Sequence, residues 1–169
     1  MGKKINKNWM QALDPEQFMI MREEGTERAG SSDLNSEKRK GFYYCAGCES
    51  KLFSSDMKYD SGSGWPSFFK SYPNVFETKT DHLLGYARTE YHCAYCDGHH
   101  GHIFDDGPEP TGKRYCNNGK ALKFKEELAE INGGRVHFWN KNAADIDIMN
   151  EYVPIIKEIV GDGTLKLLL

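Results

Sequence analysis

Two CxxC pairs constrain this chain more than any other feature of its sequence: Cys45/Cys48 and Cys93/Cys96. A turn at each pair aims two thiolates at one point, and two such turns complete a tetrahedron around Zn²⁺. The pattern predicts a structural zinc site, with paired disulfides or a redox dithiol as alternatives. Because 44 residues separate Cys48 from Cys93, beyond the about 15–20 of a compact finger, zinc should clamp two distant hairpins of a larger domain.

Length and charge exclude several classes of protein. The chain has 169 residues, enough for one domain with a buried core, and a net charge of −3. An acidic balance argues against nucleic acid, whose binding usually leaves a basic footprint. No apolar run approaches the about 18–20 residues of a membrane span, and the first residues lack the apolar segment of a secretory signal. We therefore expect the reducing cytoplasm, no membrane and no nucleic acid as partner.

The chain divides into three stretches that differ in composition. Residues 1–13 are predicted to be a flexible lead-in, residues 14–125 the main domain, and residues 126–169 a helical extension of unknown role. Within the main domain, residues 41–125 contain short aromatic or β-branched runs broken by Gly, Pro, Asn and Asp, which is typical of antiparallel strands and turns. The expected fold class is mainly β (α+β), with an N-terminal helix and a C-terminal helical extension.

The expected helices have recognisable ends. Asp14 and Pro15 form an N-cap and first-turn signature for a helix to about Glu24, with Gly25 as its stop. Lys125–Glu130 is rich in helix formers, and a second apolar helical pattern runs over residues 146–160.

The fifth cysteine, Cys116, has neighbours suited to chemistry. A lone cysteine is more often a buried, inert residue than a nucleophile. Here Arg114 and Asn118 lie two residues to either side, so on a strand all three side chains share one face. A cation there lowers the pKa of the thiol, and the amide can donate a hydrogen bond. The triplet favours an activated thiolate.

Histidines and carboxylates crowd the segment His99–Asp106. Histidine is the side chain whose ordinary pKa best suits proton delivery near neutrality. The stiff turn Gly107–Gly112 could carry the chain back and place Cys116 beside the histidines. Zinc ligation beside Cys96 and a solvated loop are the alternative interpretations.

A third segment, Ser61–Phe68, presents Trp65 between glycines and a proline. Glycines permit unusual backbone dihedrals, and Pro66 restricts the residue before it. Trp65 could be ordinary core, but its loop position favours contact with a substrate.

Together these motifs resemble the methionine-R-sulfoxide reductases, the B class of methionine sulfoxide reductase. The resemblance covers residues 8–125 and rests on both CxxC pairs and five further motifs in the right order: Pro15–Phe18, Gly25–Arg28, Ser61–Phe68, His99–Pro108 and Thr111–Asn118.

The resemblance implies two antiparallel sheets, with zinc held at one end by Cys45, Cys48, Cys93 and Cys96. It also implies reduction of methionine-R-sulfoxide, free or in proteins, to methionine, and hence repair of oxidised proteins. Its implied residue roles are these: Cys116 attacks, His99 and His102 handle the sulfoxide oxygen and its proton, Asp106 orients that network, Arg114 stabilises the thiolate, Asn118 bonds within the site, and Trp65 and Phe104 contact the substrate.

The chain departs from the family at three positions. Members with a resolving cysteine carry it between the two glycines before the tryptophan, where this chain has Ser63. We therefore expect a one-cysteine cycle, in which thioredoxin, glutaredoxin with glutathione, or another external thiol reduces the sulfenic acid on Cys116. His100 and Asn117 are polar where the family has apolar residues, and they are expected to tune substrate access.

Two other function classes fit part of the pattern. A zinc-stapled interaction module would explain the CxxC pairs but not the triplet around Cys116. A cysteine hydrolase pairing Cys116 with His102 would lack a separate oxyanion-hole motif. Turnover of methionine-R-sulfoxide separates both from a reductase.

Overall fold

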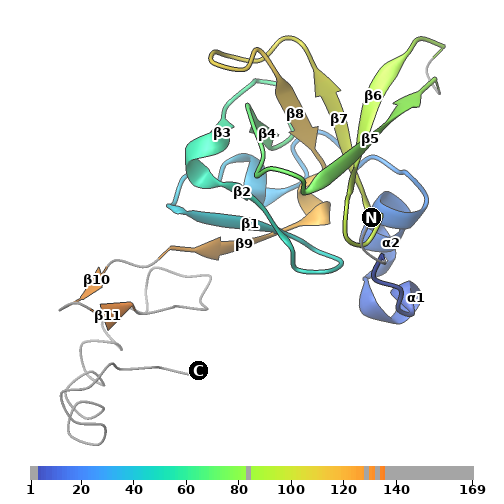
Figure 1. Cartoon of the computed structure of the whole chain (residues 1–169), viewed down its shortest axis with the longest axis horizontal. Coiled ribbons are helices and arrows are strands. Elements are labelled where there is room, and N and C mark those ends of the chain that lie inside the picture. The colour runs from blue at the N-terminus through green and yellow to red at the C-terminus, as the bar shows by residue number, and fades with distance from the viewer. Residues whose placement is uncertain (1–3, 83–84, 128–129, 132–133, 136–169) are drawn as a thin grey trace, which may run out of the picture. The chain divides into compact units, whose positions relative to one another are not determined.

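The computed structural model describes residues 4–82, 85–127, 130–131 and 134–135 (Figure 1). Contacts within the chain divide it into two units, residues 1–124 and 125–169. Among the described residues no helix has both the length and the apolar character needed to cross a membrane.

Helix α2 (Pro15–Arg22) begins where the sequence predicts and follows a single helical turn, α1 (Trp9–Ala12). Asp14 accepts a hydrogen bond from the Gln17 backbone N–H at 2.8 Å, and the Gln17 side chain accepts one from the Asp14 N–H. This capping box fixes the helix start. The helix ends at Arg22, before the expected Glu24, because Glu24 adopts a left-handed φ of 58°.

Two antiparallel sheets confirm the mainly β fold. The smaller has the order β2-β1-β9 and the larger the order β3-β4-β8-β7-β6-β5. Of three short 3₁₀ helices, η1 (Asp33–Asn35) precedes the first strand, and η2 (Ser55–Met57) and η3 (Gly119–Ala121) connect strands. The strands are β1 (Gly41–Cys45), β2 (Lys51–Ser54), β3 (Lys58–Tyr59), β4 (Ser67–Phe68), β5 (Phe76–Asp81), β6 (Arg88–Cys93), β7 (His99–Phe104), β8 (Arg114–Asn117) and β9 (Leu122–Glu126).

Aromatic side chains join the two sheets. Phe53 of β2 stacks on Phe68 of β4 with ring centroids 4.0 Å apart, and Tyr43 of β1 meets the same ring edge-on at 4.9 Å. All three side chains are fully buried. Because burial of a large apolar side chain contributes about 1.5–3 kcal/mol, this cluster is a major part of the core.

The end of the described chain differs from expectation. Lys125 and Glu126 belong to strand β9, and the following described residues form β10 (Glu130–Ile131), paired antiparallel with β11 (Gly134–Arg135). A helix over Lys125–Glu130 is therefore wrong, because pairing of β9 with β1 overrides the local helix propensity. The second expected helix, over residues 146–160, lies outside the described residues.

The N-terminal segment contacts the second CxxC turn. The Ile5 N–H donates to the Tyr95 carbonyl at 2.7 Å, and the Lys4 ammonium lies 2.7 Å from Asp97 Oδ1. Flexibility of residues 1–13 as a whole stays a prediction.

Gly101 permits the close approach of β7 and β8. A Cβ atom there would lie 2.0 Å from the carbonyl oxygen of Cys116, in a residue with φ of 155°. Gly101 lies opposite Asn117 in the register of the two strands. Any larger side chain would push β8 away at the position of Cys116.

We expect Gly101→Ala to lower the free energy of unfolding by more than about 3 kcal/mol, since it adds both overpacking and backbone strain. Denaturant unfolding measures the loss. Gly112→Ala is the matched control, because Gly112 has φ of 65° but no atom within 4 Å of its Cβ position, so it should lose only the backbone term of about 1–2 kcal/mol. Equal losses in the two variants would contradict the close approach.

Candidate active site and metal centre

One row of side chains crosses the large sheet at Cys116. The strand register places five residues successively opposite one another: Ser67 on β4, Cys116 on β8, His102 on β7, Glu90 on β6 and Lys79 on β5. Residues directly opposite in antiparallel strands share one face and lie in side-chain contact distance. The prediction that the chain turns back to bring Cys116 beside the histidines is confirmed.

Arg114 is a fixed cation on the same strand. Its Nε and Nη2 donate to the two carboxylate oxygens of Asp106, both at 2.8 Å. Its guanidinium lies over the ring of Phe104, 4.4 Å from the centroid. Phe104, which is predicted to contact the substrate, therefore packs against the guanidinium of Arg114.

The environment of Cys116 acts in two directions. Burial raises the pKa of its thiol, while the charge of Arg114 and a hydrogen bond with Ser63 lower it. The net direction is upward, because burial is the largest of these effects. The sequence correctly predicts that Arg114 lowers the pKa of Cys116. Burial of the thiol raises this pKa by a larger amount.

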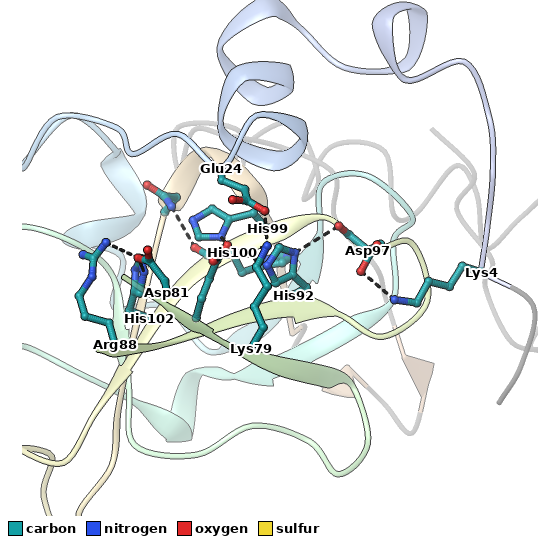
Figure 2. Close-up of polar contacts among 12 residues, drawn as sticks. Lys4, Glu24, Lys79, Asp81, Arg88, His92, Asp97, His99, His100 and His102 are labelled. Atoms are coloured by element: carbon teal, nitrogen blue, oxygen red, sulfur yellow. Dashed lines mark hydrogen bonds and ion pairs between the residues drawn. The ribbon is translucent and has the colours of Figure 1, made fainter. Parts of the chain in front are cut away.

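His102 is held by a carboxylate that the sequence analysis missed. Its Nε2 lies 2.8 Å from Oδ2 of Asp81, and the guanidinium of Arg88 contacts the same oxygen (Figure 2). The residues Asp81 and Arg88 face each other on β5 and β6. This carboxylate fixes the orientation and tautomer of the imidazole.

Glu90 is a second carboxylate that the sequence analysis missed, and it lies against His99. Oε1 of Glu90 lies 2.5 Å from Nδ1 of His99 and 2.7 Å from Nε2 of His92. Burial lowers the pKa of His99 to about 3, so its imidazole is neutral at neutral pH. Figure 2 draws the side chains of His92 and His99 as sticks.

These contacts correct the expected role of Asp106. Asp106 accepts hydrogen bonds from Arg114 on β8, whereas Asp81 and Glu90 contact the histidines. The sequence contains a signal for both carboxylates, because charged residues occupy every second position along β5 and β6. Such alternation indicates one polar sheet face, but only the register shows which histidine each carboxylate meets.

Asn118 braces the site through the backbone. Its side-chain oxygen accepts from the Glu27 N–H at 3.0 Å, and its amide donates to the His100 carbonyl at 3.0 Å. Glu27 in turn accepts from the backbone N–H groups of Gly119 and Lys120 at 2.7 and 2.9 Å. The Asn118 side chain, which is predicted to bond within the site, therefore holds the backbone of Glu27 and His100 in position.

Trp65 lies on the loop before β4 and is half-buried. Its indole Nε1 donates to the Glu27 carbonyl at 3.1 Å. Gly64 has φ of 90°, and a Cβ there would lie 2.9 Å from Ala29, so only glycine fits this turn. The indole is therefore anchored at its polar edge.

The two polar departures face the core. His100 is fully buried, and its ring packs against Tyr91 and Phe76. Asn117 is equally buried and accepts from the Tyr91 hydroxyl at 2.7 Å. Asn117 faces away from Cys116 because adjacent residues of a strand alternate, and the bulge in the register of β6 and β7 turns His100 to the core. The expectation that they tune substrate access is therefore not supported by their positions.

The four cysteines of the CxxC pairs converge. All four Sγ atoms lie within 4.8 Å of one another. The Cys45–Cys96 and Cys48–Cys93 Sγ separations are 3.6 and 3.5 Å, near the about 3.8 Å edge of a tetrahedron with 2.3 Å Zn–S bonds and far from the about 2.05 Å of a disulfide. The four sulfur atoms fit a tetrahedral metal.

The two CxxC turns are built alike. In each, the residue after the second cysteine has a left-handed φ, 62° at Glu49 and 63° at Asp97. The N–H of that residue donates to the carbonyl of the first cysteine, at 2.9 Å in the first turn and 2.8 Å in the second. This shared geometry points both pairs of sulfur atoms at one centre.

Comparison with known proteins agrees with this geometry. The family described as SelR domain matches residues 13–126. The chain is 49% identical over 125 residues to a protein of Leptospira interrogans named peptide methionine sulfoxide reductase MsrB, covering 73% of this chain and 95% of the relative. Proteins of the same name from Agrobacterium fabrum and Pseudomonas putida are 47% and 50% identical, covering 72% and 73% of this chain and 93% and 96% of theirs.

We expect Arg114→Gln to slow alkylation of Cys116 severalfold at neutral pH. Arg114 lowers the pKa of the thiol, so its loss moves the rise in reactivity to higher pH, and the rates converge once both thiols are ionised. Mass spectrometry of the Cys116 peptide after timed iodoacetamide exposure measures this. Lys113→Gln, which removes an equal charge at an exposed neighbour, should leave the profile in place; a common shift would contradict the assignment.

Proposed function

The chain belongs to the MsrB family of methionine-R-sulfoxide reductases, and we propose that Cys116 is the nucleophile of the reaction that this family performs. The reaction reduces methionine-R-sulfoxide to methionine at the expense of thiols and repairs oxidised proteins. The observation that carries the proposal is the position of Cys116, opposite His102 in the register and on one strand face with the fixed cation of Arg114. Residues 14–125 would form the reductase domain.

The first step needs a proton at the sulfoxide oxygen. Sulfoxide sulfur is a poor electrophile until its oxygen is protonated or hydrogen-bonded. The Cys116 thiolate attacks this sulfur and forms an S–S bond. The protonated oxygen then leaves the substrate sulfur for Sγ of Cys116 as that S–S bond breaks, which releases methionine. In balance, the sulfoxide and one thiol give methionine and one sulfenic acid.

Two histidines would handle the oxygen and its proton. Asp81 accepts from Nε2 of His102, which leaves Nδ1 available to the site. His99 lies beside His102, with ring centroids 5.7 Å apart. Because Asp81 and Glu90 hold these rings, they act as positioning residues for the proton donors.

The raised pKa of Cys116 suits this sequence of steps. A buried thiol keeps its proton until substrate and Arg114 together favour the thiolate. The proton that leaves the thiol can then serve the sulfoxide oxygen through an adjacent imidazole. Arg114, held by Asp106, stabilises the charge at the moment of attack.

Trp65 would receive the substrate's S-methyl group. Its polar edge is bound to the Glu27 carbonyl, so the ring face is the part left for an apolar group. Asn118 and Glu27 hold the tryptophan and Cys116 segments together.

An external thiol would close the cycle. Ser63 hydrogen-bonds Cys116 but cannot form a disulfide with it, and the other four cysteines gather at the metal centre. The sulfenic acid and two thiols give the Cys116 thiol, a disulfide and water. The proposed reductants are thioredoxin, glutaredoxin with glutathione, or another thiol of the cytoplasm, and neither nucleic acid nor a membrane is a proposed partner.

Zinc is the proposed metal of the four-cysteine centre: one structural ion held by Cys45, Cys48, Cys93 and Cys96. Four thiolates in a closed tetrahedron leave no position for substrate. The ion would supply stability, not a step of the reaction.

An epimer-resolved assay tests the proposed reaction. With dithiothreitol, the full chain should reduce the R epimer of a peptide methionine sulfoxide and leave the S epimer unchanged, and Cys116→Ser should reduce neither. Turnover that persists in Cys116→Ser would remove Cys116 from its role. Without dithiothreitol, mass spectrometry with a sulfenic-acid trap should find one oxygen on Cys116; an intramolecular disulfide there would refute the one-cysteine cycle.

Metal analysis tests the zinc assignment. We expect one zinc per chain in the purified protein and in Cys116→Ser, and none in Cys45→Ser, because only the latter loses a ligand. Chelation should reduce the free energy of unfolding by several kcal/mol, less than the about 10–16 kcal/mol of isolated zinc peptides. Zinc content well below one per chain in the unaltered protein would rule the four-thiolate site out.

A further inference from the structure

We propose that Glu90, His92 and His99 form a second metal site, separate from the four cysteines, which takes a divalent transition metal such as Zn²⁺ or Co²⁺. One carboxylate oxygen and one nitrogen from each imidazole lie within 4.8 Å of one another. Two imidazoles and a carboxylate are a ligand set that suits zinc, cobalt, nickel and iron.

The three side chains are buried together on the same sheet face. Their exposed fractions are 3% for Glu90, 8% for His92 and 1% for His99. A carboxylate removed from water in this way needs a compensating positive charge. The structure offers Lys79, whose Nζ lies 3.6 Å from Oε2 of Glu90 and also contacts Glu24. The Lys79 ammonium therefore lies between the carboxylates of Glu24 and Glu90, where a metal cation could replace it.

The tautomer of His92 points a lone pair at Glu90. Nδ1 of His92 lies 3.3 Å from the backbone carbonyl of Asp97, which can only accept, so Nδ1 carries the hydrogen. Nε2 then faces Oε1 of Glu90 at 2.7 Å. Their lone pairs would repel at that distance unless a proton or a metal ion lies between the two atoms.

The contacts to Glu90 are close but lack the alignment of hydrogen bonds. In the described part of the chain, Oε1 of Glu90, Nε2 of His92 and both ring nitrogens of His99 have no hydrogen-bond partner of acceptable geometry. In a tetrahedral site with bonds of about 2.0 Å, ligand atoms are about 3.3 Å apart. The observed 2.5 and 2.7 Å separations would therefore open by less than about 1 Å.

A cavity gives an ion access to this cluster. It has a volume of about 310 Å³, and its lining includes His92, Lys79, Glu24 and Asp97. Figure 2 shows Glu24 above His99 and beside Lys79. Because its carboxylate is half exposed, Glu24 can turn to become a fourth ligand once a metal displaces the ammonium.

The site has a consequence for His99. A metal on Nδ1 keeps the imidazole neutral and leaves its hydrogen on Nε2. The proposed reductase residue and the proposed ligand are then one side chain, so metal occupancy and sulfoxide reduction would be coupled.

Cobalt binding tests the site independently of reductase activity. The full chain, holding one zinc, is titrated with Co²⁺ while visible absorption and equilibrium dialysis are recorded. We expect one further equivalent, with d–d bands but no thiolate-to-cobalt charge transfer. His92→Leu should weaken binding by more than about tenfold, since even changes outside the ligand set cost 10–100-fold.

Two further variants sharpen the test. His82→Leu makes the same change at an exposed histidine and should bind Co²⁺ as the unaltered chain does. Lys79→Met removes the competing ammonium and should bind more tightly. Zinc content and thermal unfolding of each variant confirm its fold. No saturable binding in both the unaltered chain and Lys79→Met, equal affinity in His92→Leu, or a charge-transfer band from cysteine would overturn the proposal.

Discussion

The pairing of β7 with β8 is the interaction on which the rest of the site depends. It sets His102 opposite Cys116 and Phe104 opposite Arg114, and the turn between the strands returns Asp106 to Arg114. Gly101 makes this pairing possible, because the Cys116 carbonyl occupies the space of a side chain there. Strand β7 also pairs with β6, which leads into the second CxxC turn. One ladder of backbone hydrogen bonds therefore links the proposed nucleophile to the four-cysteine centre.

Burial and charge oppose each other at Cys116. A dry environment disfavours the thiolate, whereas a fixed guanidinium favours it, and here burial is the larger effect. A buried thiol of raised pKa is protected from indiscriminate oxidation. The proton held by the thiol and the imidazole of His102 opposite it then form one acid–base system, which suits the proposed substrate, a sulfoxide that needs protonation before attack.

The polar face of the large sheet carries residues of both proposed sites, the one for reduction and the one for a second metal ion. Asp81 contacts His102, which lies opposite the proposed nucleophile Cys116, and Glu90 contacts His99. Lys79 balances part of the carboxylate charge. His92 adds a second imidazole at Glu90 that the proposed reduction does not need. Because buried charges require partners, the same carboxylate that positions His99 is also suited to a metal ion.

Local spacing in the sequence determined the helix cap at Asp14, the two CxxC turns and the shared face of Arg114 and Cys116, since each depends on residues within a few positions. The resemblance over residues 8–125 supplied the family, its fold and its expected site. Contacts between distant strands decided the rest: that Asp81 and Glu90, not Asp106, meet the histidines, that His100 faces the core, that Lys125 continues a strand, and that burial raises the pKa of Cys116. Register and burial arise from the whole fold, so no local pattern contains them.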